Sequence, residues 1–154
     1  MPNLSLLPQT ATLIGLATQT TSGTSATLSL PLASSYRFIS QVQTASGTTP
    51  TLQVIIATSF DNGTTFNEIL SFANSTTSGQ GRQMQLRPYL GVGDQVTTDA
   101  ACSLLGTADL ASGGLVINGP INPQFIKVRW VLGGTTPSFA FQLGYIAVPQ
   151  DVSD

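Results

Sequence analysis

The stretch T-L-Q-V-I-I-A-T-S-F-D-N-G-T-T-F-N-E-I-L-S-F, residues 51–72, decides the fold of this chain. Apolar and hydroxyl residues recur on each side of its centre with the period of two that is typical of a β-strand: Leu52, Val54, Ile56 and Thr58 before it, and Phe66, Leu70 and Phe72 after it. Between them stands Asp61-Asn62-Gly63, and Asn and Gly tolerate the positive φ that a tight hairpin turn requires. The stretch therefore predicts an antiparallel hairpin.

A second hairpin is predicted near the C-terminus. In residues 125–132 an apolar face alternates with Lys127 and Arg129, and it consists of Ile126, Val128, Trp130 and Leu132. The glycine- and threonine-rich residues 133–137 predict a turn, and residues 138–148 return with Phe139, Phe141, Leu143 and Tyr145 at the same period. We expect Trp130, Phe139 and Phe141 to anchor the core.

The remaining segments complete an all-β pattern. Further strands are predicted at residues 10–18, 26–32, 36–44, 83–90 and 115–117, with a turn at residues 45–50 and a long loop at residues 73–82. Residues 91–106 fit either a short helix at 98–105 or a loop with a strand. No 3.6-residue period lasts for three turns. The expected fold is an antiparallel β-sandwich, jelly-roll-like, as a single domain over residues 10–150, after an extended N-terminal arm at residues 1–9.

Composition narrows the classes of partner. Charged residues make up 8% of the 154 residues, with 5 Lys and Arg against 7 Asp and Glu, and the basic residues are scattered. A nucleic-acid interface would need a clustered basic face, so no nucleic acid is expected. No apolar run approaches the ~20 residues of a membrane span, so no membrane is expected either. Threonine, serine, glutamine and asparagine cover the surface instead, and short hydroxyl side chains lose little rotamer entropy when an interface buries them.

The N-terminus and the cysteine count point to the cytoplasm as the place of synthesis. The apolar residues before Pro8 follow no basic stretch, unlike a secretory signal. Cys102 is the only cysteine, which rules out an intrachain disulfide, and we expect it to be a small buried residue.

Catalytic chemistry has few candidate residues. The chain contains no histidine, which excludes the usual serine and cysteine triads and histidine-bearing metal sites. Glu68 is the only glutamate, so a glycosidase-like carboxylate pair would need Glu68 with an aspartate such as Asp61, or two aspartates. Glu68 shares the inward-facing parity of Phe66 and Leu70, which also suits a strand-end or interface residue. We expect no enzyme activity.

Metal and sugar binding also have few candidate residues. Asp61, Asn62, Asp94 and Asp99 are candidate calcium ligands by residue type, but their spacing fits no continuous binding loop, so no metal or cofactor is expected. A flat aromatic face could bind carbohydrate, and the aromatic residues that suit this role are Trp130, Tyr36, Tyr89 and Tyr145. Trp130 and Tyr145 lie in strands with apolar companions, which favours the core. A carbohydrate-binding module remains an alternative.

The hairpin turn carries a recognisable motif. Its residues Ser59, Asp61, Asn62, Gly63, Thr65 and Phe66 fit the pattern S-x-D-x-G-x-T-W/F, which resembles the Asp-box of sialidase propeller blades. The resemblance implies that the Asp61 carboxylate accepts hydrogen bonds within the turn and that Phe66 packs below it. A propeller repeats the box, whereas this chain has one copy, so a structural role is favoured over sialidase activity.

Residues 52–72 together with I-K-V-R-W-V-L-G-G-T-T-P-S-F-A-F, residues 126–141, resemble a pattern of small virion proteins of tailed bacteriophages. In that pattern an S-x-D-G-G-T-T-W hairpin precedes an R-x-R-W strand and a Gly-Gly-Thr-x-Pro-Ser-Phe turn. This chain has Asn62 for the first glycine and Phe66 for the tryptophan. Within that group, capsid decoration (cement) proteins are the closest in size.

The resemblance implies a virion β-sandwich that binds between subunits of the major capsid protein and stabilises the head. We expect a homo-oligomer, a trimer on local symmetry axes, located on the capsid surface. The arm at residues 1–9 and the loops at 73–82 and 91–101 are expected contacts. A tail, neck or fibre-associated sandwich is the alternative virion location.

Overall fold

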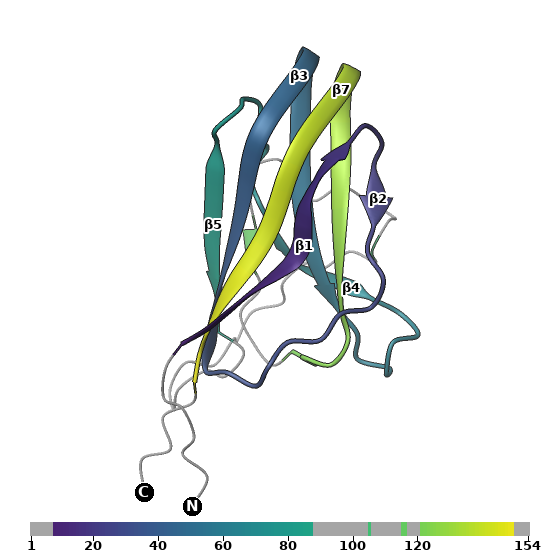
Figure 1. Ribbon diagram of the computed structural model, residues 1–154. Helices are drawn as coiled ribbons and strands as arrows, with labels where there is room; N and C mark the ends of the chain where they lie inside the picture. The colour runs from purple at the N-terminus through teal and green to yellow at the C-terminus, as the bar shows by residue number, and fades with distance from the viewer. Residues whose placement is uncertain (1–7, 88–104, 106–114, 117–120, 150–154) are drawn as a thin grey trace, which may run out of the picture.

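The fold is described from a computed structural model, which describes residues 8–87, 105, 115–116 and 121–149. All its regular elements are strands: β1 (Gln9–Gln19), β2 (Gly23–Thr24), β3 (Ser35–Thr58), β4 (Asn67–Ser71), β5 (Gly81–Leu86), β6 (Leu115–Val116) and β7 (Ile126–Val148) (Figure 1). The predicted all-β class is confirmed for these residues.

The strands form one antiparallel sheet. Its order is β1-β7-β3-β4-β6, and β2 pairs with β7 while β5 pairs with β3. The described strands at the two ends of this order do not pair with each other, so the sheet is open. Hydrogen bonding thus makes a single continuous sheet and does not divide it into the two sheets of a sandwich.

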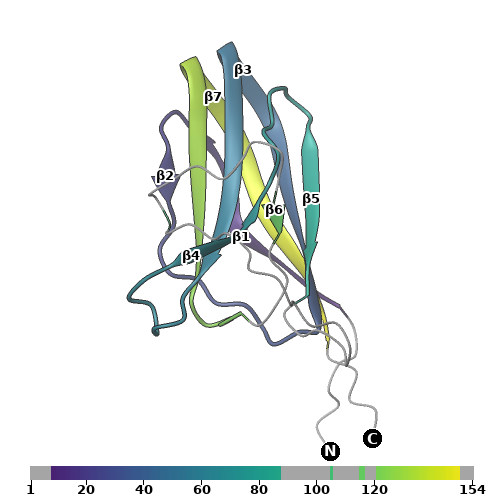
Figure 2. The ribbon, with the colours of Figure 1, turned by 180° about the vertical axis from the view of Figure 1, so that it is seen from behind.

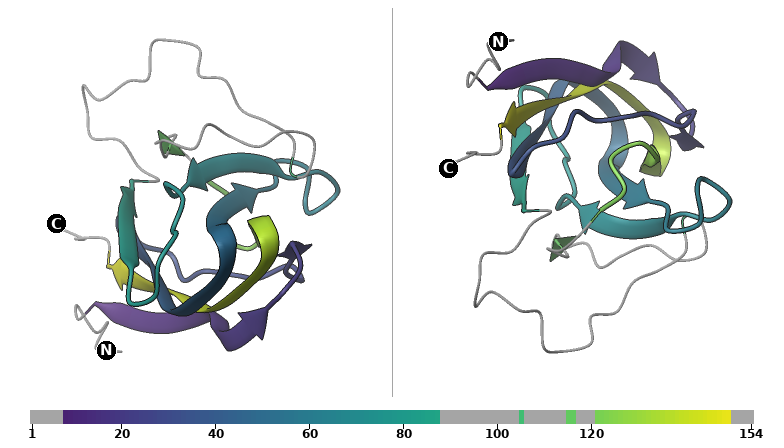
Figure 3. Two further views of the ribbon diagram at one scale, coloured as in Figure 1. Left: turned by 90° about the horizontal axis from the view of Figure 1, so that it is seen from above. Right: turned by 90° about the horizontal axis from the view of Figure 1, so that it is seen from below.

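Two long strands run through the whole molecule. β3 has 24 residues and β7 has 23, and they pair with each other from Ser35↔Val148 to Thr58↔Ile126. Figures 1 and 2 show both strands rising to one end of the molecule, bending there and running back. The sheet therefore folds over on itself, and Figure 3, which looks along the strands, shows the two halves curving around a common interior.

The bend is built from a repeated motif. Gly-Thr-Thr-Pro occurs at residues 47–50 in β3 and at residues 134–137 in β7, and the two copies lie opposite each other, with Thr48 paired to Thr135. Both copies have positive φ at their first and third residues. The values are 118° at Gly47 and 49° at Thr49 in β3, and 99° at Gly134 and 49° at Thr136 in β7. We call this pair of motifs the double bend. It interrupts the regular pairing and lets two adjacent strands turn together.

The core lies between the two halves. It takes alternate residues from each arm of the long strands and from their neighbours, namely Tyr36, Phe38, Val42, Leu52, Val54, Ile56, Leu70, Phe72, Leu86, Ile126, Val128, Phe139, Phe141 and Leu143. Burying each of these side chains contributes about 1.5–3 kcal/mol. Tyr36 satisfies its hydroxyl by donating to the carbonyl of Pro31.

The predicted hairpin at residues 51–72 is present. The end of β3 pairs antiparallel with β4, from Ile55↔Ser71 to Thr58↔Asn67. Residues 10–18 and 36–44 also lie in strands as predicted, in β1 and β3, and residues 81–86 and 115–116 form β5 and β6.

Three predictions about the strands are wrong. The segments at residues 125–132 and 138–148 do not form a hairpin, because both belong to β7 and pair with β3. The turn predicted at residues 45–50 is part of β3, at the double bend. Residues 26–32 contribute an isolated bridge from Leu28 to Ile126 rather than a strand, and Leu32 is largely exposed.

Two predicted contact segments fall largely or wholly outside the described residues. Of the arm at residues 1–9, residues 1–7 lie outside, and Gln9 begins β1 opposite Ala147. The stretch at residues 91–106, with its loop or helix, Asp94, Asp99 and Cys102, lies outside apart from residue 105, as does Tyr89.

Candidate functional site

The hairpin turn is a closed hydrogen-bond network. The Asp61 carboxylate accepts from the Thr65 amide and the Thr65 hydroxyl, both at 2.7 Å, and from the Ser59 hydroxyl at 2.8 Å. The Ser59 Oγ in turn accepts from the Gly63 amide at 2.7 Å and from the Asp61 amide at 3.3 Å. Asp61 therefore acts as the acceptor at the centre of the turn, as the motif implies.

The geometry of the turn explains its glycine. Asn62 and Gly63 take positive φ of 55° and 90°, the conformation expected of this pair. A Cβ on residue 63 would lie 2.9 Å from the Phe125 ring, so the loop at residues 121–125 also requires glycine there. The Thr65 bonds, the largest cause, together with the Ser59 bond lower the pKa of Asp61 from 3.8 to about 2.

Phe66 packs on the face of the sheet opposite to the core. Its side chain is buried but belongs to no core cluster, and the Lys127 ammonium lies 4.5 Å from the centre of its ring. A cation over an aromatic face is an attractive arrangement. The motif thus links the hairpin to β7.

The predicted core anchors come together on the inner face. Phe139 and Phe141 are fully buried, and Trp130 is partly buried against the same cluster, with its ring edge-on to Phe141 at a centroid distance of 6.1 Å. The indole Nε1 of Trp130 donates to the carbonyl of Thr21 at 3.1 Å. Gly23 packs directly under this ring, which leaves no room for a side chain.

Glu68 points away from the core, contrary to the predicted parity. A register shift between Ile56 and Ala57 places Leu70 opposite Ile56 and Glu68 opposite Ala57. β4 therefore has one extra residue, Ile69, between these two pairs. This β-bulge reverses the alternation that the sequence shows.

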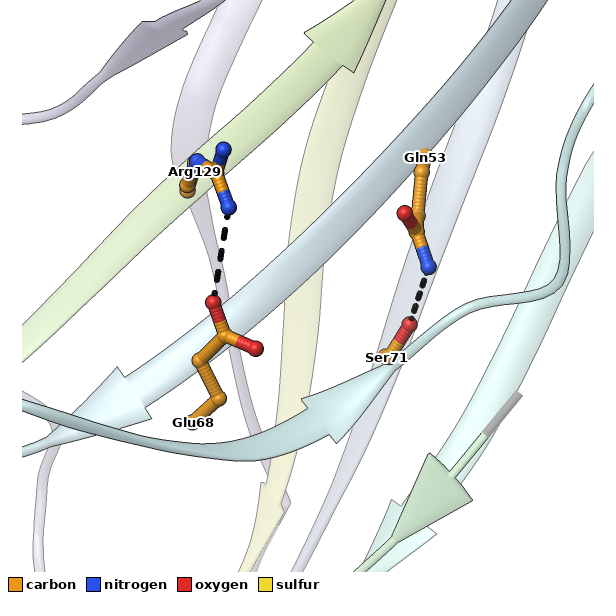
Figure 4. Close-up of polar contacts among 4 residues, drawn as sticks. All are labelled: Gln53, Glu68, Ser71 and Arg129. Carbon is orange, nitrogen blue, oxygen red and sulfur yellow. Dashed lines mark hydrogen bonds and ion pairs between the residues drawn. The ribbon is translucent and has the colours of Figure 1, made fainter. Parts of the chain in front are cut away.

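On this outer face Glu68 forms an ion pair with Arg129 of β7. Its Oε1 lies 3.6 Å from the Arg129 guanidinium, and its side chain is fully buried while that of Arg129 is 19% exposed (Figure 4). Beside this pair, Gln53 of β3 donates from Nε2 to the Ser71 Oγ at 2.8 Å (Figure 4). The buried Glu68 carboxylate needs a partner such as Arg129, because burying a charge without one costs free energy.

Both faces of the end of β3 are buried. Gln53, Ile55 and Ala57 on the outer face are as inaccessible as Val54 and Ile56 on the core face. The uninterrupted run V-I-I-A at residues 54–57 was the sequence signal for this, because a strand buried on both faces loses its polar alternation.

The other half of the sheet presents a broad polar surface, which sequence reasoning missed. Its outward positions on β5, β3 and β7 carry Gln83, Gln85, Gln41, Gln43 and Gln142, which we call the glutamine face. All are exposed except Gln142, which is half-buried and donates from Nε2 to the Gln41 Oε1 at 2.6 Å. The alternation of Gln41 and Gln43 with buried residues, and of Gln83 and Gln85 with Met84, was the available signal.

Two shallow grooves cross this surface. One of about 340 Å³ lies between Leu16, Gln43 and Gly79, and one of about 260 Å³ lies between Thr10, Ile39 and Ile146; Gln41 and Gln142 line both. In the strand segments that form this face, Arg37 is the charged residue with an outward side chain. The surface thus offers amides, hydroxyls and a few aliphatic groups.

The residues that could serve metal binding, catalysis or sugar binding do not come together in the described part of the chain. In the part of the chain that the structure describes, no three His, Cys, Asp or Glu residues lie together as a metal site. Asp61 and Glu68 are engaged separately, in the turn and with Arg129. Tyr36 is buried, and Tyr145 and Trp130 pack against the core, so these three do not form the flat aromatic platform considered for sugars. Across residues 8–87, 105, 115–116 and 121–149, no helix has the length and hydropathy needed to cross a membrane.

Comparison with protein-family models, curated proteins and solved structures finds no match to this chain. The resemblance to virion proteins therefore rests on the motif residues themselves.

Proposed function

We propose that this chain is a structural, non-enzymatic virion protein of a tailed bacteriophage, a capsid decoration (cement) protein that binds between subunits of the major capsid protein. The observation that carries the proposal is the glutamine face, a broad sheet surface with little charge. Glutamine and threonine side chains can form many hydrogen bonds across an interface without burying an unpaired charge.

The folded-over sheet supports this role as a β-sandwich-like unit. Its two halves share one core, and β3 and β7 hold them together, so the glutamine face is backed by buried aromatic residues. A rigid backing reduces the entropy cost of binding. Many copies on one shell would make modest individual interfaces of about 1,000 Å² or more sufficient.

The assembly we propose is a trimer on the capsid surface. A cyclic trimer matches local threefold positions of a shell, and light scattering should then give three times the 16.0 kDa mass of one chain. A monomer at working concentration would overturn the trimer without affecting the shell contact.

Binding to undecorated heads of the phage that encodes the chain tests the shell contact. Gln43→Lys and Gln85→Lys place charges on the exposed glutamine face, and we expect at least about tenfold weaker binding to the heads, since burying an unpaired charge costs more than about 1.4 kcal/mol. Gln124→Lys, at an exposed glutamine in the loop at residues 121–125, is the matched control and should bind like the wild type.

Cryo-microscopy of the same particles separates the alternatives. Density on the shell in many copies supports decoration, and density at the tail, neck or fibres in few copies replaces it with those roles. Binding of wild-type protein to glycans but not to heads would support the carbohydrate-binding module instead.

A further inference from the structure

The hairpin turn contains a pair of residues, Asn62 and Gly63, that is chemically reactive in addition to its structural role. Asn62 is exposed at the tip with φ of 55°, and Gly63 follows it with φ of 90°. An asparagine followed by glycine is the pair most open to deamidation, because glycine has no side chain to hinder its own backbone nitrogen.

The reaction has defined steps. The Gly63 backbone nitrogen would lose its proton and attack the side-chain carbonyl carbon of Asn62, forming a new C–N bond and a five-membered succinimide while ammonia leaves. Water then opens the ring at either carbonyl. One opening gives aspartate, and the other gives isoaspartate, in which the backbone runs through the former side chain.

The folded turn holds the attacking nitrogen. The Gly63 N–H donates to the Ser59 Oγ at 2.7 Å, and Ser59 is itself 1% exposed and fixed by its bond to Asp61. The Phe125 ring also lies close to Gly63, where it would be 2.9 Å from an added Cβ. The nitrogen must therefore leave a short, shielded hydrogen bond before it can lose its proton and reach Asn62.

We propose that Asn62 is a deamidation site that the intact turn keeps unreacted, with the Ser59 hydroxyl setting its rate. When the turn opens, Asn62 converts irreversibly. The product carries a new carboxylate beside that of Asp61, and the isoaspartate form adds a methylene to the backbone at a position with a fixed left-handed conformation. Opening of the turn thus controls how fast the hairpin deamidates.

Site-resolved peptide mapping during incubation in mildly alkaline buffer tests this. Ser59→Ala should convert Asn62 at least about tenfold faster than the folded wild type. The Ser59 hydroxyl takes part in three hydrogen bonds of the turn, and losing about 1.4 kcal/mol among them already shifts the opening equilibrium by that factor. Thr64→Ala is the matched control, since its hydroxyl bonds to the Asp61 carbonyl and not to Gly63. It should convert at the wild-type rate.

Two further measurements keep the test decisive if Ser59→Ala does not fold. Wild-type protein in concentrated urea should convert Asn62 at a rate close to that of Asn118, the other asparagine followed by glycine, and much faster than in the folded protein. Below the unfolding midpoint, hydrogen exchange of the Gly63 amide and conversion of Asn62 should rise in parallel. Equal conversion in folded and unfolded wild type, or a folded Ser59→Ala variant that matches Thr64→Ala, would overturn the proposal.

Discussion

Replacing Gly134 with alanine should destabilise the fold strongly, because this residue meets two separate constraints at the double bend. Its φ of +99° costs a residue with a side chain about 1–2 kcal/mol. The added Cβ would also lie 2.6 and 2.7 Å from the carbonyl oxygens of Thr49 and Thr48 and 3.0 Å from the Pro50 Cα, and such overpacking against backbone costs about 1–3 kcal/mol. The expected loss is about 2–5 kcal/mol, or a fall in Tm of about 5–20 °C for a chain of this length.

Urea and thermal unfolding followed by circular dichroism measure this loss. Gly81→Ala is the matched control, since Gly81 also lies in a strand but has no positive φ and no atom near its Cβ position, so its Tm should change little. Gly47→Ala should resemble Gly134→Ala, because its Cβ would lie 2.8 Å from the Thr136 carbonyl oxygen at φ of +118°. If Gly134→Ala melts within error of Gly81→Ala, neither the positive φ nor the nearby carbonyl oxygens constrain Gly134.

Three further substitutions test other parts of the structure. Asp61 has a pKa of about 2 in the fold against 3.8 as its ordinary value, so its carboxylate stabilises the fold fully above pH 4, and this stabilisation is lost as pH falls toward 2. Asp61→Asn should therefore flatten the fall in Tm between about pH 4 and pH 2. A variant with the wild-type dependence of Tm on pH would contradict the hydrogen-bond network. Glu68→Gln should lower the free energy of unfolding in urea by about 1–3 kcal/mol, because it leaves a buried polar group poorly paired. Part of that loss should be absent when Arg129 is already replaced by methionine, and full additivity in this double-mutant cycle would show that the ion pair contributes nothing. Phe141→Ala should cost about 3–5 kcal/mol and shift the emission of Trp130, the only tryptophan, to longer wavelength, and unaltered emission would place the indole elsewhere.

The hairpin at residues 51–72 could be predicted from sequence because its signals are local. Asp61-Asn62-Gly63 fixes the turn, and the residues on either side alternate, so no distant contact was needed. The inward faces of the long strands followed from the same alternation, as Val128 and Phe139 show.

The double bend could not be recognised as such from the same local rules. Gly-Thr-Thr-Pro has the composition of a turn, and a turn reverses a strand upon itself. Here two copies lie side by side, and each strand keeps its partner through the bend, with Thr48 opposite Thr135. The repetition of the motif was visible, but only pairing between residues far apart in sequence makes it a shared corner.

The orientation of Glu68 was mispredicted for a related reason. A single bulged residue shifts the side-chain parity, and the sequence of β4 does not mark Ile69 as that residue. The glutamine face was overlooked because its members come from three strands, and each strand contributes one or two of them.

The shared long strands also govern how this molecule comes apart. β1, β2, β4 and β5 each pair with β3 or β7, and each of those two strands passes through both halves of the sheet. Neither half can therefore unfold while the other stays folded, because both contain parts of β3 and β7. The described sheet is therefore expected to melt all-or-none, without a half-folded intermediate, and to resist deformation as one body rather than as two hinged plates.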